Sequence, residues 1–311
     1  MIKKKIEKYI GKIFKGSSEN LKFQNGCAQL NSLRHLYKDI TKLNQVELKI
    51  FSQNGEDGII DYLIFQLNIE KPKFLEIGVG DYSESNTRFF YERTSSKGAI
   101  IDCIKNFKNE VLRKNKIWKG DLEIIDKKIN SENILEVLKI KNVFENLDIF
   151  SIDIDGIDYW IIKELPKNFS KIAIIEYNSV FGNEKSFSVP NVQNFNRSDY
   201  HYSNLCFGMS LKAAVEIMEE KNFYFVGVNL MRNNAFFISK EFQKNDYFKN
   251  LKIDKLEQIN EANFRESRDK NGTLNYLSGK EKIKEISECE VVDLSDPSLP
   301  KVKIRDLLEL I

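Results

Sequence analysis

The residues of this 311-residue chain that can do chemistry gather at the ends of predicted strands. Asp153 and Asp155 alternate at the end of one apolar run, so their side chains share one face. Glu176 and Asn178 form the matching pair at the end of the next run. Oxygen ligands of this kind suit Mg²⁺ or Mn²⁺, and such a cation lowers the pKa of a bound hydroxyl. We therefore predict a metal site of these four residues; the alternative is that they cap helices or orient loops.

A second group begins at Phe74, where an apolar run stops at a glycine turn with Glu76 two places before the first glycine. Gly78 and Gly80 can adopt positive φ and allow a ligand close to the backbone. This strand, turn and following helix are typical of a nucleotide-binding α/β sheet. Ser83 stands where a dinucleotide fingerprint needs its third glycine, which argues against pyrophosphate binding in the usual way.

Two further residues are candidates for contacts with ligand. Asp102 ends the next apolar run, about 20 residues after the glycine turn, where an acid can accept hydrogen bonds from both hydroxyls of a ribose. His201 lies in a long connection after the fifth strand, and its ordinary pKa suits a general base. Asp102 could instead be an ordinary strand-end residue and His201 a plain loop histidine. The neighbours of His201 suit recognition of a polar substrate: Arg197, Asp199, Tyr200 and Tyr202.

Seven predicted strands position these residues, with helices between the first six. Strands six and seven leave no room for a helix, which predicts an antiparallel hairpin at a sheet edge. The fold class is therefore α/β, a Rossmann-like seven-stranded sheet with helices on both faces. The predicted strands are residues 73–79, 98–103, 122–125, 148–154, 171–177, 224–229 and 235–238.

We divide the chain into an N-terminal helical extension (1–47), a catalytic domain (48–240) and a C-terminal appendage (241–311) that is helical or loop-rich and packs on the same domain. Isoleucines at helical spacing alternate with lysines from Ile2 to Ile13, which predicts a basic amphipathic helix. It would lie on an anionic membrane surface, or pack on the domain or on a second subunit of a homo-oligomer. Residues 16–30 have the composition of a linker before a helix over 30–43.

Composition excludes several classes of protein. The formal net charge of +2 gives no footprint for nucleic acid. The four cysteines are far apart, which indicates neither a zinc site nor a disulfide framework. The chain has no apolar run of about 20 residues for a spanning helix and no signal peptide. We expect a cytoplasmic protein, peripheral to the inner membrane if the basic helix binds there.

Five segments together resemble bacterial S-adenosylmethionine-dependent methyltransferases of class I, near the FkbM type associated with capsule and other surface polysaccharides. The resemblance covers roughly residues 48–295, and its segments are 51–58, 74–80, 151–160, 174–178 and 234–237. It implies S-adenosylmethionine as the methyl donor. The implied acceptor is a sugar hydroxyl, or a small group such as a phosphoramidate attached to a sugar, on a small-molecule or nucleotide-linked substrate. Residues 205–210 depart from the pattern, which leaves the acceptor contacts open.

On this reading we assign roles to individual residues. His201 and Asp155 are the candidate catalytic residues. The polar loop 51–58 either lies over the cofactor or caps a helix. The predicted cofactor contacts are Gln53, Glu76, Gly78, Gly80, Asn86, Asp102 and Asp153.

Two other functions compete with methyl transfer. One is a nicotinamide-dependent sugar-nucleotide oxidoreductase, against which Ser83 and the terminal hairpin argue. The other is a non-catalytic scaffold that keeps the methyltransferase fold and pairs with an active enzyme through the N-terminal helix. The set of acidic residues and His201 argues against the scaffold.

Overall fold

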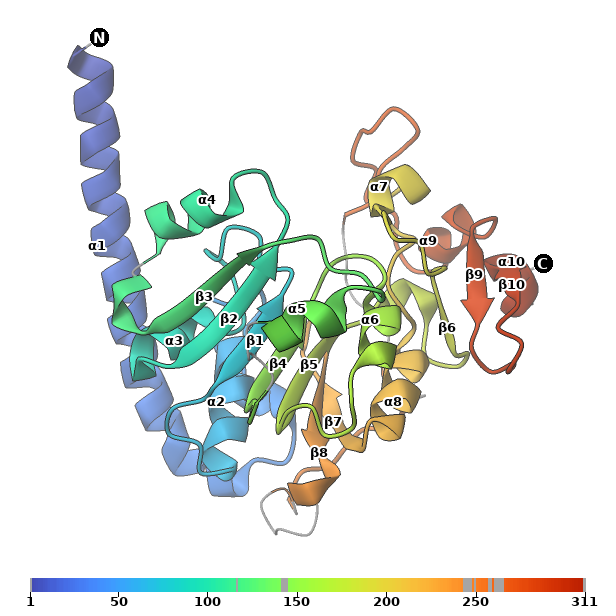
Figure 1. Ribbon diagram of the computed structural model, residues 1–311, viewed down its shortest axis with the longest axis horizontal. Coiled ribbons are helices and arrows are strands. Elements are labelled where there is room, and N and C mark those ends of the chain that lie inside the picture. Colours follow the sequence, from blue (N-terminus) through green and yellow to red (C-terminus); the bar gives the residue numbers. More distant parts are fainter. Residues whose placement is uncertain are drawn as a thin grey trace.

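A seven-stranded mixed sheet forms the centre of the protein in the computed structural model (Figure 1). The structure describes residues 2–115, 117–140, 145–242, 248, 250–256, 259 and 266–309, and the side chains of this set except 2–15 and 140. The strands of the sheet are β1 (Phe74–Ile77), β2 (Lys97–Asp102), β3 (Asp121–Asp126), β4 (Ile149–Ile152), β5 (Ile172–Glu176), β7 (Phe223–Val228) and β8 (Asn234–Ser239).

The strand order is β3-β2-β1-β4-β5-β8-β7, and the first five strands in this order are parallel. The chain builds outward from β1 to β3 and then crosses back to place β4 on the other side of β1. Such a reversal opens a crevice at the carboxyl ends of the two central strands, where α/β sheets bind their ligands. The α/β Rossmann-like fold expected from the sequence is confirmed.

The last two strands form the expected hairpin, with β8 antiparallel to both β5 and β7. β8 lies inside the sheet and β7 forms its edge. Because β8 runs in the opposite direction, its first residue, Asn234, pairs with Glu176 at the end of β5. The hairpin thus brings an amide to the edge of the sheet that carries the acidic residues.

Helices cover both faces of the sheet (Figure 1). The apolar residues of the strands alternate between the two sides: Phe74 packs with one set of helices, and Leu75 with the other. One face carries α1 (Ile2–Leu33), α2 (Glu56–Gln66), α3 (Arg88–Thr94) and α4 (Phe107–Lys114); the other carries α5 (Ile134–Ile140), α6 (Asp158–Glu164) and α8 (Leu211–Glu220).

The N-terminal helix corrects one sequence prediction. Residues 16–30 are part of α1 and not a linker, and the helix ends at Leu33 before a 3-10 turn at Arg34–Asp39. Phe23 and Leu30 pack into the core on this face, and Gly26 lies so close to Ile50 that a Cβ would be 2.5 Å from Ile50 Cδ1. Tertiary packing therefore outweighs the glycine and serine content. The side chains from Ile2 to Ile13, which carry the membrane prediction, lie outside the described residues.

The C-terminal segment also differs from the prediction, because it contributes strands. β9 (Glu290–Asp293) pairs with β10 (Lys301–Lys303) and with β6 (Phe187–Ser188), a short strand in the connection after β5. Two short helices, α9 (Lys280–Glu285) and α10 (Ile304–Leu307), flank this second sheet. Arg265, which belongs to the segment covered by the resemblance, lies outside the described residues.

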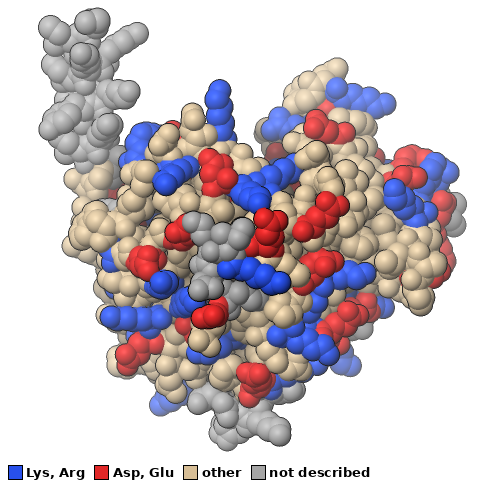
Figure 2. Space-filling view, viewed as in Figure 1, with Lys and Arg blue, Asp and Glu red and all other residues tan. Residues whose placement is uncertain are grey.

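Charged side chains of both signs are interspersed over the face of the molecule shown in Figure 2. This distribution agrees with the small net charge. Among the described residues, no helix combines the length and apolar character that a membrane span requires.

Candidate active site

A cavity of about 900 Å³ lies at the carboxyl ends of β1, β2 and β4. It occupies the crevice expected at the point where the strand order reverses. All seven residues predicted to contact the cofactor line it: Gln53, Glu76, Gly78, Gly80, Asn86, Asp102 and Asp153. The structure therefore brings together residues that are spread over about a hundred positions of the sequence.

The two glycine positions of the turn differ in the space available for a side chain. Both have positive φ, +85° at Gly78 and +54° at Gly80. A Cβ on Gly78 would lie 1.6 Å from the carbonyl oxygen of Asp153, so this position is closed by the backbone of the neighbouring strand. A Cβ on Gly80 would meet nothing within 4 Å. Gly78 thus permits the packing of β1 against β4, whereas Gly80 borders open space in the cavity.

Glu76 fixes the loop that follows the glycine turn. Its carboxylate accepts hydrogen bonds from Ser85 Oγ (2.6 Å), from the backbone amides of Asn86 (2.9 Å) and Thr87 (3.0 Å), and from the Thr87 hydroxyl. Burial raises the pKa of Glu76, and these donors oppose that effect. The Asn86 side chain donates to Ser151 Oγ on β4 (3.0 Å). The first acidic residue of the motif therefore shapes one wall of the cavity.

Asp102 holds the other side of the turn. One carboxylate oxygen accepts from the Gly80 amide (2.7 Å), and the other accepts from the amides of Cys103 (2.6 Å) and Ile104 (3.0 Å). Each oxygen has two lone pairs, so these three bonds leave one acceptor position, on the oxygen that binds the Gly80 amide.

The polar loop before α2 is a structural element with one side on the cavity. Asp57 accepts from the backbone amides of Ile50, Phe51 and Ser52, each at 2.7 Å, and this network presents Phe51 and Gln53 to the cavity. Burial raises the pKa of Asp57 to about 6.

The neighbouring Glu56 ties this loop to the last hairpin. Its carboxylate accepts from the side-chain amides of Asn229 (2.8 Å) and Asn234 (3.0 Å). The loop and the hairpin therefore support each other, and both interpretations of the loop hold in part: it caps α2 and it borders the ligand site.

Three carboxylates meet beside the large cavity. One ligand oxygen from each of Asp153, Asp155 and Glu176 lies within 4.8 Å of the others. They line a second, smaller cavity of about 180 Å³, and Gln53 and Arg197 line both. The two cavities share Gln53, Asp153, Asp155 and Arg197, so a molecule in the second would face a molecule in the first.

The electrostatics of this group are unfavourable in the absence of a cation. Burial, with Asp155 close by, raises the pKa of Asp153 to about 8. Burial and the nearby Asp153 raise the pKa of Glu176 well above its ordinary value. Glu176 Oε2 has no hydrogen-bond partner among the described residues, although it is buried. Asp57 Oδ1 is unpartnered in the same way, so the missing donor at Glu176 points to a ligand because three carboxylates also converge there.

Two of the predicted site residues have other surroundings. The side chain of Asn178 donates to the carbonyls of Leu205 (2.8 Å) and Phe207 (2.9 Å) and accepts from the Val180 amide (3.0 Å). Its amide therefore holds the loop before α8, whatever part it has in binding a metal. These bonds also give a structural role to residues 205–210, the segment that departs from the family pattern.

His201 lies outside the residues that line either cavity, within the described part of the chain. Its ring packs against Tyr202, and its Nδ1 is 2.7 Å from Ser203 Oγ. Burial lowers the pKa of His201. It thus lines neither of the cavities that the carboxylates line, and its role as the base stays a prediction.

Arg197, four residues before His201, lines both cavities. It begins the short helix α7 (Arg197–Tyr200) and forms ion pairs with Asp155 (2.6 Å) and Glu266 (3.3 Å). Arg197 is among the substrate contacts predicted from the sequence, whereas Glu266 is not. Glu19 and Lys22, which line the large cavity from α1, are not predicted either, because the composition of residues 16–30 indicates a linker. Continuing the helical period past Gly16 would have placed both on one face.

No family model matches the sequence, and no curated protein matches it. Solved structures give distant matches. One is an S-adenosylmethionine-dependent methyltransferase from Clostridium acetobutylicum, with 10% identity over 67% of this chain and 98% of the other, at a TM-score of 0.38. Another is human N-acetylserotonin methyltransferase in complex with SAM, with 8% identity over 71% of this chain and 56% of the other, at a TM-score of 0.32. These values are too low to carry an argument about function.

Proposed function

We propose that the protein is an S-adenosylmethionine-dependent O-methyltransferase. The observation that carries this proposal is the position of β8, the antiparallel strand between β5 and β7. It completes the seven-stranded sheet that the resemblance implies, with the hairpin in place of the helix that a dinucleotide fold would more often have there. The cavity above β1 and β4 is the donor site, and the acid-lined cavity beside it is the acceptor site.

The donor contains a methyl group on a cationic sulfonium, which an acceptor oxygen can displace directly. In this transfer the carbon–sulfur bond breaks, a carbon–oxygen bond forms, the electron pair stays on sulfur and the hydroxyl proton leaves. The chain's task is to place the two reactants in line at about 3 Å, which supplies much of the rate. Asp102 accepts one ribose hydroxyl at its remaining acceptor position, Glu76 keeps the loop 85–87 in place, and Gly80 leaves room for the ligand.

The carboxylates at the junction of the cavities take the proton. Asp153 and Asp155 border both cavities, so either can reach a hydroxyl that faces the donor. A base with a pKa near the working pH is effective in general base catalysis, and the raised pKa of Asp153, about 8, meets this condition.

The same group fits a hard divalent cation. Three carboxylates converge, Glu176 Oε2 lacks a donor, and oxygen-only ligands suit Mg²⁺ or Mn²⁺. Asp153, Asp155 and Glu176 would then hold the ion as ionised ligands, and the cation would activate the acceptor by lowering the pKa of a coordinated hydroxyl, in place of the raised pKa of Asp153. In the same proposal, the acceptor is a sugar hydroxyl, or a small group linked to a sugar, in surface polysaccharide biosynthesis.

Calorimetric titration with S-adenosylhomocysteine, in parallel with NAD⁺ and each with and without Mg²⁺, tests the proposal. We expect micromolar binding of S-adenosylhomocysteine and none of NAD⁺. Binding of NAD⁺ alone would replace methyl transfer by hydride transfer. If S-adenosylhomocysteine binds, transfer of a labelled methyl group to nucleotide sugars, compared between wild type and D155N, separates an active enzyme from a scaffold.

A further inference from the structure

The N-terminal helix forms one wall of the large cavity. Glu19 and Lys22 of α1 line it, together with Ser83 and Glu84 of the loop after the glycine turn. The turns of α1 from Phe23 to Leu33 pack on the face that carries α2 and α3. A helix that precedes the catalytic domain in the sequence therefore reaches the donor site.

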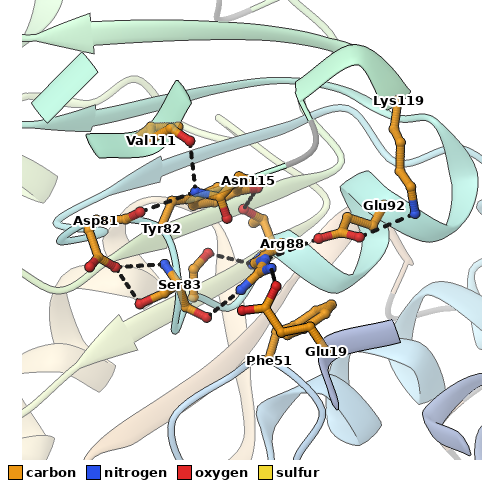
Figure 3. A network of polar contacts seen from close by, with 12 residues as sticks. Glu19, Phe51, Asp81, Tyr82, Ser83, Arg88, Glu92, Val111, Asn115 and Lys119 are labelled. Carbon is orange, nitrogen blue, oxygen red and sulfur yellow. Dashed lines mark hydrogen bonds and ion pairs between the residues drawn. The ribbon is translucent and has the colours of Figure 1, made fainter. Parts of the chain in front are cut away.

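A buried arginine fixes this part of α1 in place (Figure 3). Arg88 is 2% exposed, donates to the carbonyl of Ser83 (2.8 Å), and forms ion pairs with Glu92 (3.1 Å) and with Glu19 of α1 (3.3 Å). Its guanidinium also stacks 4.0 Å above the ring of Phe51. One side chain thus connects the helix, the glycine loop and the loop before α2.

Aromatic packing adds a second connection. Phe23 stacks on Phe51 with ring centroids 6.4 Å apart and contacts Phe89 at 5.8 Å. Because Phe51 itself lines the cavity, the position of α1 and the shape of the cavity are set together.

Two groups of lining residues differ in chemistry, and we call them the nucleoside end and the charged end. The nucleoside end consists of Asp102, an acceptor for a ribose hydroxyl, with the apolar Ile104 and Ile129; the Lys127 amide donates to the Asp102 carbonyl (3.0 Å), which keeps residues 127–129 beside Asp102. The charged end is the wall of α1 with a lysine and two glutamates, which Arg88 holds beside Ser83 instead. A donor that places its nucleoside at the first end directs its amino-acid portion, with one carboxylate and one ammonium group, toward the charged end.

Lys22 is the cation available at that end. It is exposed, its Nζ lies 5.8 Å above the Phe51 ring, and no described carboxylate forms an ion pair with it. Glu19 is already paired with Arg88, and Glu84 with Lys49 at 3.7 Å. Arg88 is the other cation there, and its groups are taken up by Ser83, Glu92 and Glu19.

We propose that α1 completes the amino-acid end of the donor site and that Lys22 pairs with the α-carboxylate of the bound donor and of its product. This inference rests on the proposed function. It gives the N-terminal extension a part in ligand binding and makes Lys22 a residue that distinguishes the complete donor from its nucleoside fragment.

The test compares S-adenosylhomocysteine with 5′-methylthioadenosine, which keeps the nucleoside and the thioether but lacks the amino-acid portion. Dissociation constants of both ligands are measured by calorimetry for wild type, K22Q and K128Q. Lys128 lines the same cavity at the nucleoside end, so K128Q removes the same charge from the other end. Unfolding midpoints of all three proteins confirm that they fold.

We expect K22Q to bind S-adenosylhomocysteine about fivefold more weakly and to bind 5′-methylthioadenosine with unchanged affinity, as for the loss of one solvent-accessible ion pair. K128Q should leave the ratio of the two dissociation constants unchanged. If K22Q lost affinity equally for both ligands, or for neither, the role of Lys22 would be overturned while the proposed function would still stand. If wild type bound neither ligand, the proposed function would fail and this inference with it.

Discussion

Two buried glutamates on parallel strands of one sheet have opposite surroundings. Glu76, on β1, accepts hydrogen bonds from three successive residues of the following loop. Glu176, at the end of β5, faces two aspartates, and one of its oxygens has no donor among the described residues. Both are less than a tenth exposed. Burial alone therefore does not tell a structural carboxylate from a functional one; the donors and the like charges that face it have to be considered together.

The difference has a thermodynamic meaning. A carboxylate that is fully hydrogen-bonded stabilises the fold and loses that contribution when it is replaced. A carboxylate held against like charges costs stability, and such strain persists at sites where a ligand relieves it. Glu76 thus has its partners within the fold, whereas the carboxylates at the ends of β4 and β5 face one another.

The largest effect is expected from G78A, at the contact between β1 and β4. The added Cβ would lie 1.6 Å from the Asp153 carbonyl oxygen at a residue with φ of +85°, so the strands must separate. We expect a loss of more than about 4 kcal/mol in unfolding free energy, measured by urea denaturation. A stable G78A would mean that the contact between β1 and β4 is not as tight as described.

The matched pair E76Q and E176Q tests the comparison itself. An amide in place of Glu76 leaves loop donors unsatisfied, so we expect the unfolding free energy to fall by about 3 kcal/mol. The same substitution at Glu176 removes a like charge and should leave stability unchanged or raise it at pH 8. Equal losses in the two variants would break the distinction between them.

The pH dependence of the unfolding free energy tests the carboxylates at the ends of β4 and β5. With its pKa raised from 3.8 to about 8, Asp153 keeps in the native state a proton that the unfolded chain releases. For this group stability is therefore highest below about pH 4 and falls by up to about 1.4 kcal/mol for each pH unit between 4 and 8. D153N should reduce this slope without abolishing it, because the raised pKa values of Glu176, Glu76 and Asp57 act in the same direction. Mg²⁺ should restore stability at pH 8 in wild type and not in D153N; a slope of equal size in both proteins would assign it elsewhere.

The smallest expected change is in G80A. No atom lies within 4 Å of the added Cβ, and only the positive φ of +54° opposes it, at a cost of about 1 kcal/mol. The protein should fold, while its affinity for S-adenosylhomocysteine falls because the methyl group enters the cavity. Calorimetry on the folded variant checks this, and undiminished binding would show that the ligand does not approach Gly80.

The sheet could be predicted because most of its strands contain an apolar run with a clear end, although β3 alternates apolar with acidic residues. The acids at those ends were also found, since parallel strands bring their carboxyl ends to one edge. The hairpin followed from the short spacing between its two strands. These features depend on local pattern and on a general rule of α/β topology.

The rest depends on contacts that local pattern does not contain. The glycine and serine of residues 16–30 indicated a linker, but Phe23 and Leu30 bury against a distant part of the chain. The ordinary pKa of His201 suggests a base, but its position outside the lining of both cavities is visible only in three dimensions. The donors around Glu76 come from the loop that follows it, while those that Glu176 lacks could be judged only in three dimensions.

The interior position of β8 has a consequence for the folding of the chain during its synthesis. β8 is the last of the seven strands to be synthesised, yet it fills the gap between β5 and β7. Until residue 239 has left the ribosome, β5 presents an unpaired apolar edge, which is a template for pairing with other chains. The pairing of β5 with β8 is also non-local, and contacts of this kind form slowly. The strand that brings Asn234 to the site is therefore the one whose late arrival leaves the nascent chain most prone to aggregation.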